Sequence, residues 1–244
     1  MSSLSFKKKA RSEIWSAIQQ AGAGRFPGIL GRIPNFKGSE QACERLATTE
    51  LFENATFIKS NPDSPQRKLR HLALKKGKTL YLAVPKLAHE KPFLELDPSQ
   101  PGEKELWQAS SIKGSFELGR PVSIEEIPRI DLIITGCVGV TSKGARLGKG
   151  GGYADLEYAL LRQFNRVDEN TPVVTVVHPV QVLDDDSFPM LEHDTSIDMY
   201  ATPSEVFRCT RKYSRPKGIY PKALKREKID AIPVLRRYFQ GRPF

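Results

Sequence analysis

Cysteine and histidine are scarce in this chain of 244 residues, which has three cysteines and four histidines. Cys43, Cys137 and Cys209 are odd in number, lie far apart and form no CxxC pair. This pattern argues against a disulfide framework and against a zinc site. The histidines show no metal-ligand spacing either.

Long apolar runs are also absent, since none approaches the ~20 residues that a helix needs to span a bilayer. The N-terminal stretch MSSLSFKKKARSE has basic residues but no apolar segment after them, so it does not resemble a secretory signal. We therefore expect a soluble, cytoplasmic protein that has no membrane partner.

Acidic residues are in the minority, with 28 Asp and Glu against 38 Lys and Arg, a net charge of +10 and a pI of about 9.5. Such an excess favours anionic partners, such as nucleotides, phosphorylated small molecules or nucleic acid. The charge alone is also consistent with a basic surface that binds no anionic partner.

Apolar and helical segments alternate along the chain. Helical patterns cover residues 7–20, 39–52, 67–76, 153–164 and 232–239, and strand patterns cover residues 55–59, 80–85, 130–140, 172–178 and 199–202. Residues 89–117 show weak periodicity and are expected to form a surface excursion. The alternation predicts an α/β fold with a mostly parallel sheet and helices on both faces. We expect one domain over residues 1–244, with a basic C-terminal extension from about residue 207.

Glycine is concentrated in the stretch RLGKGGGYADLEY, residues 146–158, between the 130–140 strand and the next helix. Its glycines are Gly148, Gly150, Gly151 and Gly152. Glycines let a ligand approach the main chain closely, and successive N–H groups at a helix start can converge on an anion. Arg146 and Lys149 add positive charge, and Asp155 can ligate the Mg²⁺ that accompanies a nucleotide. The motif GxxxxGK[ST] is absent because Gly150 follows Lys149, so a generic mobile loop is the alternative to a phosphate site.

Several ordered elements are more specific than the glycines. The stretch Gly144–Asp155 follows the form G-x-R-x-G-x-G-x-G-Y-Y-D, Gln181 follows a later strand, and an HD-x-x-x-D element occupies residues 193–198. Lys7 and Arg11 form K-x-x-x-R on the first helix. Together these elements resemble the 5-formyltetrahydrofolate cyclo-ligase family, the methenyltetrahydrofolate synthetases. RIPNFKGSEQACERL and GYADLEYA resemble its methenyltetrahydrofolate synthetase domain-containing branch.

This resemblance implies a three-layer α/β fold and the ATP-dependent closure of 5-formyltetrahydrofolate, a reduced folate, to 5,10-methenyltetrahydrofolate. In the family mechanism the formyl oxygen attacks the γ-phosphate, and N10 then displaces the phosphate. Such a transfer depends on alignment and charge neutralisation.

The family pattern also implies a role for individual residues. Lys7 and Arg11 contact the ATP phosphates, and Arg146 and Lys149 act in catalysis as well as in ATP binding. The stretch Gly148–Gly152 cradles the transferred group, and Tyr153 contacts both the nucleotide and the folate. The resemblance further implies that Asp155 and Asp194 hold Mg²⁺. With these roles, Asp155→Ala and Lys149→Ala are expected to abolish turnover and leave the fold intact.

Two departures from the family pattern affect the substrate side. Ala154 replaces the second tyrosine, and Asp63-Ser64-Pro65-Gln66 stands where the family has E-x-x-T. Asp63 keeps a carboxylate for the pteridine but has a shorter reach. Glu157 is expected to face solvent or to pair within its helix.

Two other hypotheses stay open at this point. In the first, the protein keeps the fold but acts on another substrate or is inactive. In the second, the basic tail, residues 208–242, binds nucleic acid through cations interleaved with aromatic rings. We do not favour the second, because no recognised nucleic-acid motif is present.

Overall fold

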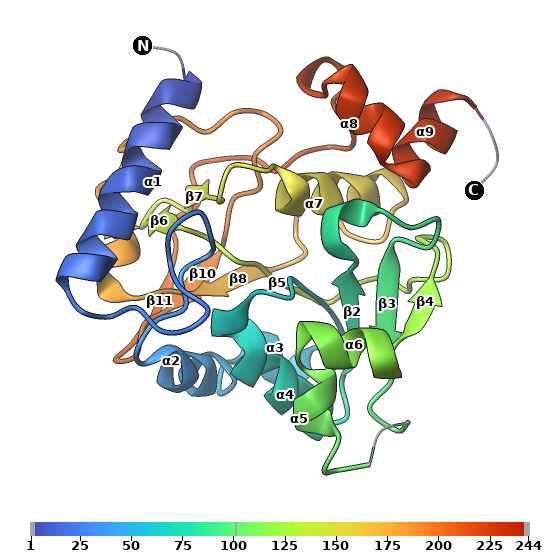
Figure 1. Cartoon of the computed structure of the whole chain (residues 1–244), viewed down its shortest axis with the longest axis horizontal. Helices are drawn as coiled ribbons and strands as arrows, with labels where there is room; N and C mark the ends of the chain where they lie inside the picture. The colour runs from blue at the N-terminus through green and yellow to red at the C-terminus, as the bar shows by residue number, and fades with distance from the viewer. Residues whose placement is uncertain (1–2, 101, 242–244) are drawn as a thin grey trace.

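A mixed eight-stranded sheet forms the centre of the computed structural model, which describes residues 3–100 and 102–241 (Figure 1). Its strands, in the order β11-β10-β8-β5-β1-β2-β3-β4, are β1 (Phe57–Ser60), β2 (Thr79–Ala83), β3 (Phe93–Leu96), β4 (Arg120–Val122), β5 (Leu132–Ile134), β8 (Val173–Val176), β10 (Met199–Ala201) and β11 (Val206–Arg208). The five central strands run parallel, whereas β3, β4 and β11 pair antiparallel at the edges. The predicted α/β fold with a mostly parallel sheet is confirmed.

Helices cover both faces of this sheet. They are α1 (Ser3–Gln20), α2 (Ser39–Leu46), α3 (Glu50–Asn54), α4 (Arg67–Lys75), α5 (Leu106–Ala109), α6 (Ile112–Leu118), α7 (Tyr153–Gln163), α8 (Arg226–Ala231) and α9 (Pro233–Phe239). Helices α2 to α6 lie on one side in Figure 1, and α7, α8 and α9 lie on the other. Within the described part of the chain, no helix is long and apolar enough to cross a membrane.

The strand sequences explain the two-sided core. Along β2, Leu80 and Leu82 pack under α2 and α4, whereas Tyr81 and Ala83 face the side of α7. The same alternation occurs in β5 and β8, because successive side chains of a strand point to opposite faces. Near-continuous apolar runs are therefore what a parallel sheet covered on both faces requires.

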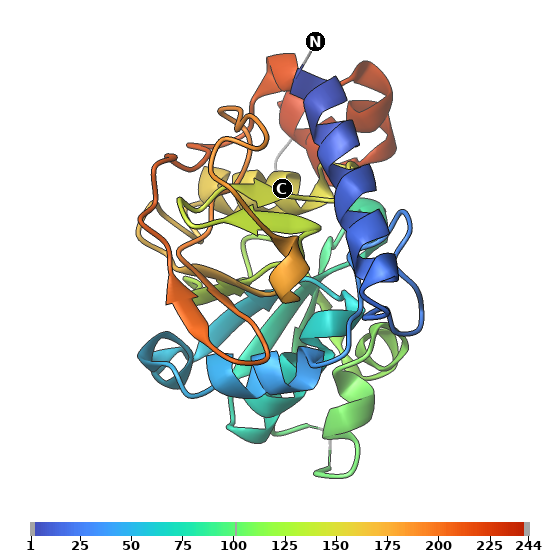
Figure 2. The ribbon, with the colours of Figure 1, turned by 90° about the vertical axis from the view of Figure 1, so that its left-hand side faces the viewer.

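The segment 130–140 is not the single strand that its apolar run predicts. Strand β5 ends at Ile134, and the chain then enters a second, three-stranded sheet of β6 (Gly139–Thr141), β7 (Arg146–Leu147) and β9 (Val182–Leu183). Both halves of the segment are buried, so hydropathy gives no sign of the break at Thr135–Val138. Helix α1 packs along this small sheet (Figure 2) through Ile14 and Ile18.

The expectation for residues 89–117 was also wrong. This segment contains β3, α5 and most of α6. Strand β3 buries Phe93, Leu94 and Leu96 against the sheet. The helices are too short to show a clear period of 3.6 residues, which is why the pattern looked irregular.

Candidate active site at the glycine-rich loop

The glycine-rich loop connects β7 to α7 at the carboxyl ends of the central strands, where ligands bind in open α/β sheets. Gly150 has φ of 108° and Gly152, the residue preceding α7, has φ of 63°. Both values lie in the left-handed region that favours glycine. None of the backbone N–H groups of residues 148–152 donates a hydrogen bond to another residue described by the structure. The loop therefore offers free donors at the N-terminal end of an 11-residue helix.

Two cations hold the carbonyl oxygens of this loop. Arg11 Nε, from α1, donates to the oxygen of Gly148 at 2.6 Å. Lys228 Nζ, from α8, donates to the oxygen of Gly151 at 2.8 Å and lies 4.4 Å from the centre of the Tyr153 ring. Segments from the two ends of the sequence thus meet at the loop.

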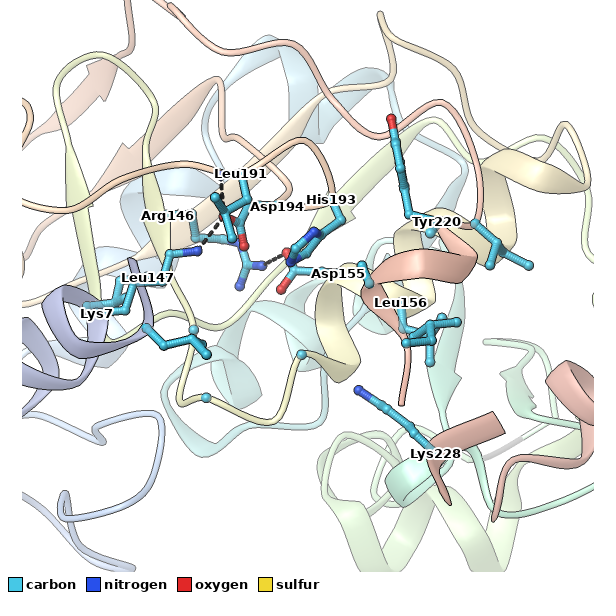
Figure 3. Close-up of a pocket in the computed structure, with 18 of the residues that line it drawn as sticks. Lys7, Arg146, Leu147, Asp155, Leu156, Leu191, His193, Asp194, Tyr220 and Lys228 are labelled. Carbon is cyan, nitrogen blue, oxygen red and sulfur yellow. Dashed lines mark hydrogen bonds and ion pairs between the residues drawn. The ribbon is translucent and has the colours of Figure 1, made fainter. Parts of the chain in front are cut away.

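Two cavities lie on either side of the loop, with volumes of about 170 Å³ and about 420 Å³. We call them the basic cavity and the strand-end cavity. The basic cavity (Figure 3) lies between Lys7, Arg146 and Asp194 on one side and Leu156, Tyr220 and Lys228 on the other. Arg11 and Leu224 also line it. The strand-end cavity is lined by Asn61, Asp63, Ala83, Pro85, Gly136, Lys149, Tyr153, Ala154 and Glu157, among others. Arg146, Gly148, Gly152 and Asp155 line both cavities.

Arg146 is a buried cation at the junction of the cavities. Its Nε and Nη1 atoms donate to the carbonyl oxygens of Thr195 and Gly136, both at 3.1 Å, and its Nη2 donates to Asp155. The side chain is fixed by these bonds, so it supplies positive charge at a constant position. Although burial alone would raise the pKa of Asp155, the Arg146 charge and the Thr195 N–H bond together lower it.

The two predicted metal ligands are each engaged by a cation. Oδ1 of Asp155 accepts from Arg146 and from the Thr195 N–H at 2.9 Å, whereas Oδ2 of Asp194 accepts from Lys7 and from the Leu191 N–H at 2.6 Å. Among residues 3–100 and 102–241, no group of three or more His, Cys, Asp or Glu side chains forms a metal site. Mg²⁺ commonly takes one or two carboxylates together with substrate phosphates and water, so this pair fits a metal that arrives with a nucleotide.

Asp63 projects toward the strand-end cavity from the segment that follows β1. A Cβ atom at Gly136 would lie 2.4 Å from Asp63 Oδ2, so a larger residue there would displace the carboxylate from its present position. The buried Arg70 fixes the segment by donating to the carbonyl oxygens of Asn61, Pro62 and Asp63 at 2.7–3.2 Å. Lys149 Nζ lies 4.0 Å from Asp63 Oδ1, so these two predicted site residues face each other across the cavity.

Burial raises the pKa of the Asp63 carboxyl above its ordinary value of 3.8, and the charges of Lys149 and Arg70 only partly oppose this shift. A raised pKa in the folded state means that the protonated carboxyl stabilises the fold at low pH, and this contribution is lost as the pH rises through the folded-state pKa.

Asp63→Asn is therefore expected to increase the melting temperature at pH 7.5, because it removes a partly buried charge whose contact with the half-exposed Lys149 is weak. The difference from the original protein should shrink as the pH falls toward 4. Thermal denaturation monitored by circular dichroism at pH 4.5, 6.0 and 7.5 measures the trend. An Asp63→Asn protein that is less stable at pH 7.5 would show that the carboxylate is structural.

Glu157 is not solvent-facing, contrary to the expectation from sequence. Its Oε2 atom accepts from Lys59 Nζ at 2.5 Å and from Asn61 Nδ2 at 2.7 Å, and only 6% of the residue is exposed. Lys59 extends from β1 on the face that α7 covers. The ion pair therefore connects β1 to α7 beneath the strand-end cavity. A lysine that directly follows two apolar residues in the strand FIKS was the signal available in the sequence.

The structure brings the predicted residues together around one loop. Lys7, Arg11, Arg146 and Asp194 meet at the basic cavity, Asp63, Lys149 and Tyr153 line the strand-end cavity, and Asp155 lies between them. Nothing in the sequence indicated Tyr220 and Lys228. They lie about 60 to 70 positions after the glycine-rich stretch, and no local motif connects them with the site.

Comparison with protein families gives a match of residues 7–203 to the 5-formyltetrahydrofolate cyclo-ligase family. The chain belongs to this family. The match includes every predicted site residue, from Lys7 to Asp194, and it ends before the C-terminal segment that carries Tyr220 and Lys228.

Among curated proteins, methenyltetrahydrofolate synthase domain-containing proteins from Mus musculus and Danio rerio are similar to this chain, with 37% and 35% identity over 94% and 95% of it. The chain spans about three fifths of their length, 62% and 61% respectively. Among solved structures, 5,10-methenyltetrahydrofolate synthetase from Aquifex aeolicus is similar, with a TM-score of 0.52 and 20% identity over 87% of this chain and 95% of that one. This last similarity supports the fold.

Proposed function

We propose that this protein is an ATP-dependent cyclo-ligase that closes 5-formyltetrahydrofolate to 5,10-methenyltetrahydrofolate and releases ADP and phosphate. The observation that carries this proposal is the arrangement of two cavities around one glycine-rich loop. A reaction that transfers a phosphoryl group between two substrates needs adjoining sites with a charged junction.

The basic cavity suits the nucleotide. Lys7, Arg11 and Arg146 provide positive charge there, and the unpaired N–H groups of the loop can receive phosphate oxygens. In this structure Arg11 donates a hydrogen bond to the carbonyl oxygen of Gly148. A phosphate oxygen can replace that carbonyl oxygen as the acceptor. Asp155 and Asp194 would hold Mg²⁺, which neutralises phosphate charge during the transfer.

The strand-end cavity suits the folate. It is the larger of the two and combines apolar walls from Ala83 and Pro85 with the carboxylates of Asp63 and Glu157. Carboxylates are acceptors for the N–H groups of a pteridine, and Tyr153 offers a ring at the cavity wall. Ala154 also lines this cavity, so the absence of the second tyrosine leaves additional room there.

Lys149 and Arg146 are the proposed catalytic cations. Lys149 is half exposed on the loop and reaches the strand-end cavity, whereas Arg146 is fixed between the cavities. Both would stabilise charge that develops on the phosphoryl group as it leaves ADP for the formyl oxygen.

The decisive experiment follows the near-ultraviolet absorbance of the methenyl product when purified protein is mixed with 5-formyltetrahydrofolate and Mg-ATP. We expect time-dependent absorbance that requires both substrates. We also expect Mg-ATP at 100 times its dissociation constant to stabilise the fold by about 2.7 kcal/mol. Stabilisation by Mg-ATP without product would indicate a nucleotide-binding protein with another substrate, and the absence of both effects would refute the proposal.

The hypothesis of nucleic-acid binding by the tail has less support from the geometry. Phe207 stacks on Tyr200 with ring centres 4.9 Å apart, and Ile232, Val234 and Leu235 are buried in the core. Part of the tail is thus packed against the core, although many of its other residues are exposed. Nucleic-acid binding stays a prediction, and a steep loss of RNA affinity with rising salt would support it.

A further inference from the structure

The segment 217–231 closes the basic cavity from the side opposite α1, although it lies outside the range of the family match. Ile219, Tyr220, Ala223, Leu224 and Lys228 all line the cavity. The picture of the cavity (Figure 3) shows Tyr220 and Lys228 across from Lys7 and Arg146.

This segment is anchored at both ends. Before it, the buried Arg215 donates to the carbonyl oxygens of Ser196, Glu169 and Thr171 and pairs with Asp198. After it, Ile232, Val234 and Leu235 are almost fully buried against the core that includes α7. A segment fixed in this way holds its side chains at a defined place on the cavity wall.

Lys228 carries a charge that forms no ion pair with any other residue in the part of the chain that the structure describes. Burial lowers the pKa of its ammonium group, and the more distant charges of Asp155 and Glu157 oppose the shift. Its contacts are the carbonyl oxygen of Gly151 and the Tyr153 ring, both neutral. A partly desolvated cation next to a glycine-rich loop can bind an anionic oxygen through a charge-assisted hydrogen bond.

The remaining residues of the segment are mostly apolar toward the cavity. Leu156 of α7, Tyr220 and Leu224 all line the cavity, so its wall includes an apolar part that suits a flat, weakly polar group. The Lys228 ammonium group suits the phosphates of a nucleotide, and the apolar wall suits its base.

We infer that the C-terminal segment contributes Tyr220, Leu224 and Lys228 to the nucleotide site, with Lys228 binding a phosphate oxygen in place of the Gly151 carbonyl and with Tyr220 and Leu224 contacting the base. This inference rests on the proposed function for the identity of the ligand. Lys228 then adds to the positive charge of Lys7, Arg11 and Arg146 at the basic cavity, and it lies beyond the residues that the family match covers.

Isothermal titration calorimetry with Mg-ATP and with adenosine tests this inference on the full chain. Lys228→Met is expected to weaken Mg-ATP binding about tenfold, in line with one lost charge-assisted contact, and to leave adenosine binding unchanged. Lys228→Arg should retain most of the Mg-ATP affinity. Tyr220→Ala should weaken the binding of both ligands. Lys225→Met, an exposed lysine directly before α8, is the matched control and should bind like the original protein.

Each outcome bears on a different claim. If the original protein binds Mg-ATP and Lys228→Met binds it equally well, the inference is wrong while the proposed function stands. Equal weakening of Mg-ATP and adenosine by Lys228→Met would also overturn it, because the lysine would then only support the loop. If the original protein binds no Mg-ATP, the proposed function itself fails and the inference with it. Thermal denaturation of every variant verifies that it is folded.

Discussion

Asp155→Ala is expected to lower the free energy of unfolding by about 3–5 kcal/mol, because it leaves the buried Arg146 guanidinium without its carboxylate. The sequence alone predicted an intact fold for this variant, and the ion pair changes that expectation. Loss of activity in Asp155→Ala would therefore not by itself show a role in metal binding. Urea denaturation at pH 7.5 measures the effect.

Asp155→Asn separates the two roles of this side chain. The amide keeps an oxygen that can accept from Arg146 and from the Thr195 N–H, so we expect a smaller loss of stability but a large loss of Mg-ATP-dependent turnover. Asp230→Ala is the control, because Asp230 pairs with Arg226 at the surface of α8, and such a pair contributes about 0.5 kcal/mol or less. Equal effects of Asp155→Ala and Asp230→Ala would contradict the structural role of the buried pair.

Lys149→Ala is expected to reduce turnover by about 100-fold or more while the stability changes little. The side chain is half exposed and its contact with Asp63, at 4.0 Å, is loose, so the fold does not depend on it. If Lys149 stabilises the transferred phosphoryl group, the loss appears in kcat rather than in KM for the folate. The absorbance assay with saturating substrates measures kcat directly.

Lys143→Ala provides the comparison for this variant. Lys143 precedes the same loop and is similarly exposed, but its partner is Asp185, outside both cavities. We expect turnover close to that of the original protein. A Lys149→Ala protein with normal kcat would remove this residue from the proposed mechanism.

The glycine-rich loop and its helix could be predicted from sequence because their signals are local. Gly150 and Gly152 occupy left-handed conformations, and α7 begins at Tyr153 as expected. Gly77, with φ of 74°, likewise follows the end of α4 near the predicted place. In these cases the residue type and the backbone conformation are linked by sterics.

The features that were missed depend on distant contacts. Glu157 looks like a surface residue of an amphipathic helix until Lys59 is known to lie beneath it. Lys228 and Arg70 act on main-chain carbonyl oxygens, and such contacts require no matching partner type in the sequence. The break after Ile134 was hidden because both sides of it are buried.

The contacts between α1, the glycine-rich loop and α8 also bear on how the protein matures during synthesis. Lys7 pairs with Asp194 across 187 positions, and Lys228 reaches the loop across 77. Contacts this far apart in sequence form late, since the intervening chain must first be brought together. A nascent chain on the ribosome would thus form its central strands before α1, the glycine-rich loop and α8 could come together, and under the inference above it should reach full Mg-ATP affinity only after Lys228 has left the exit tunnel.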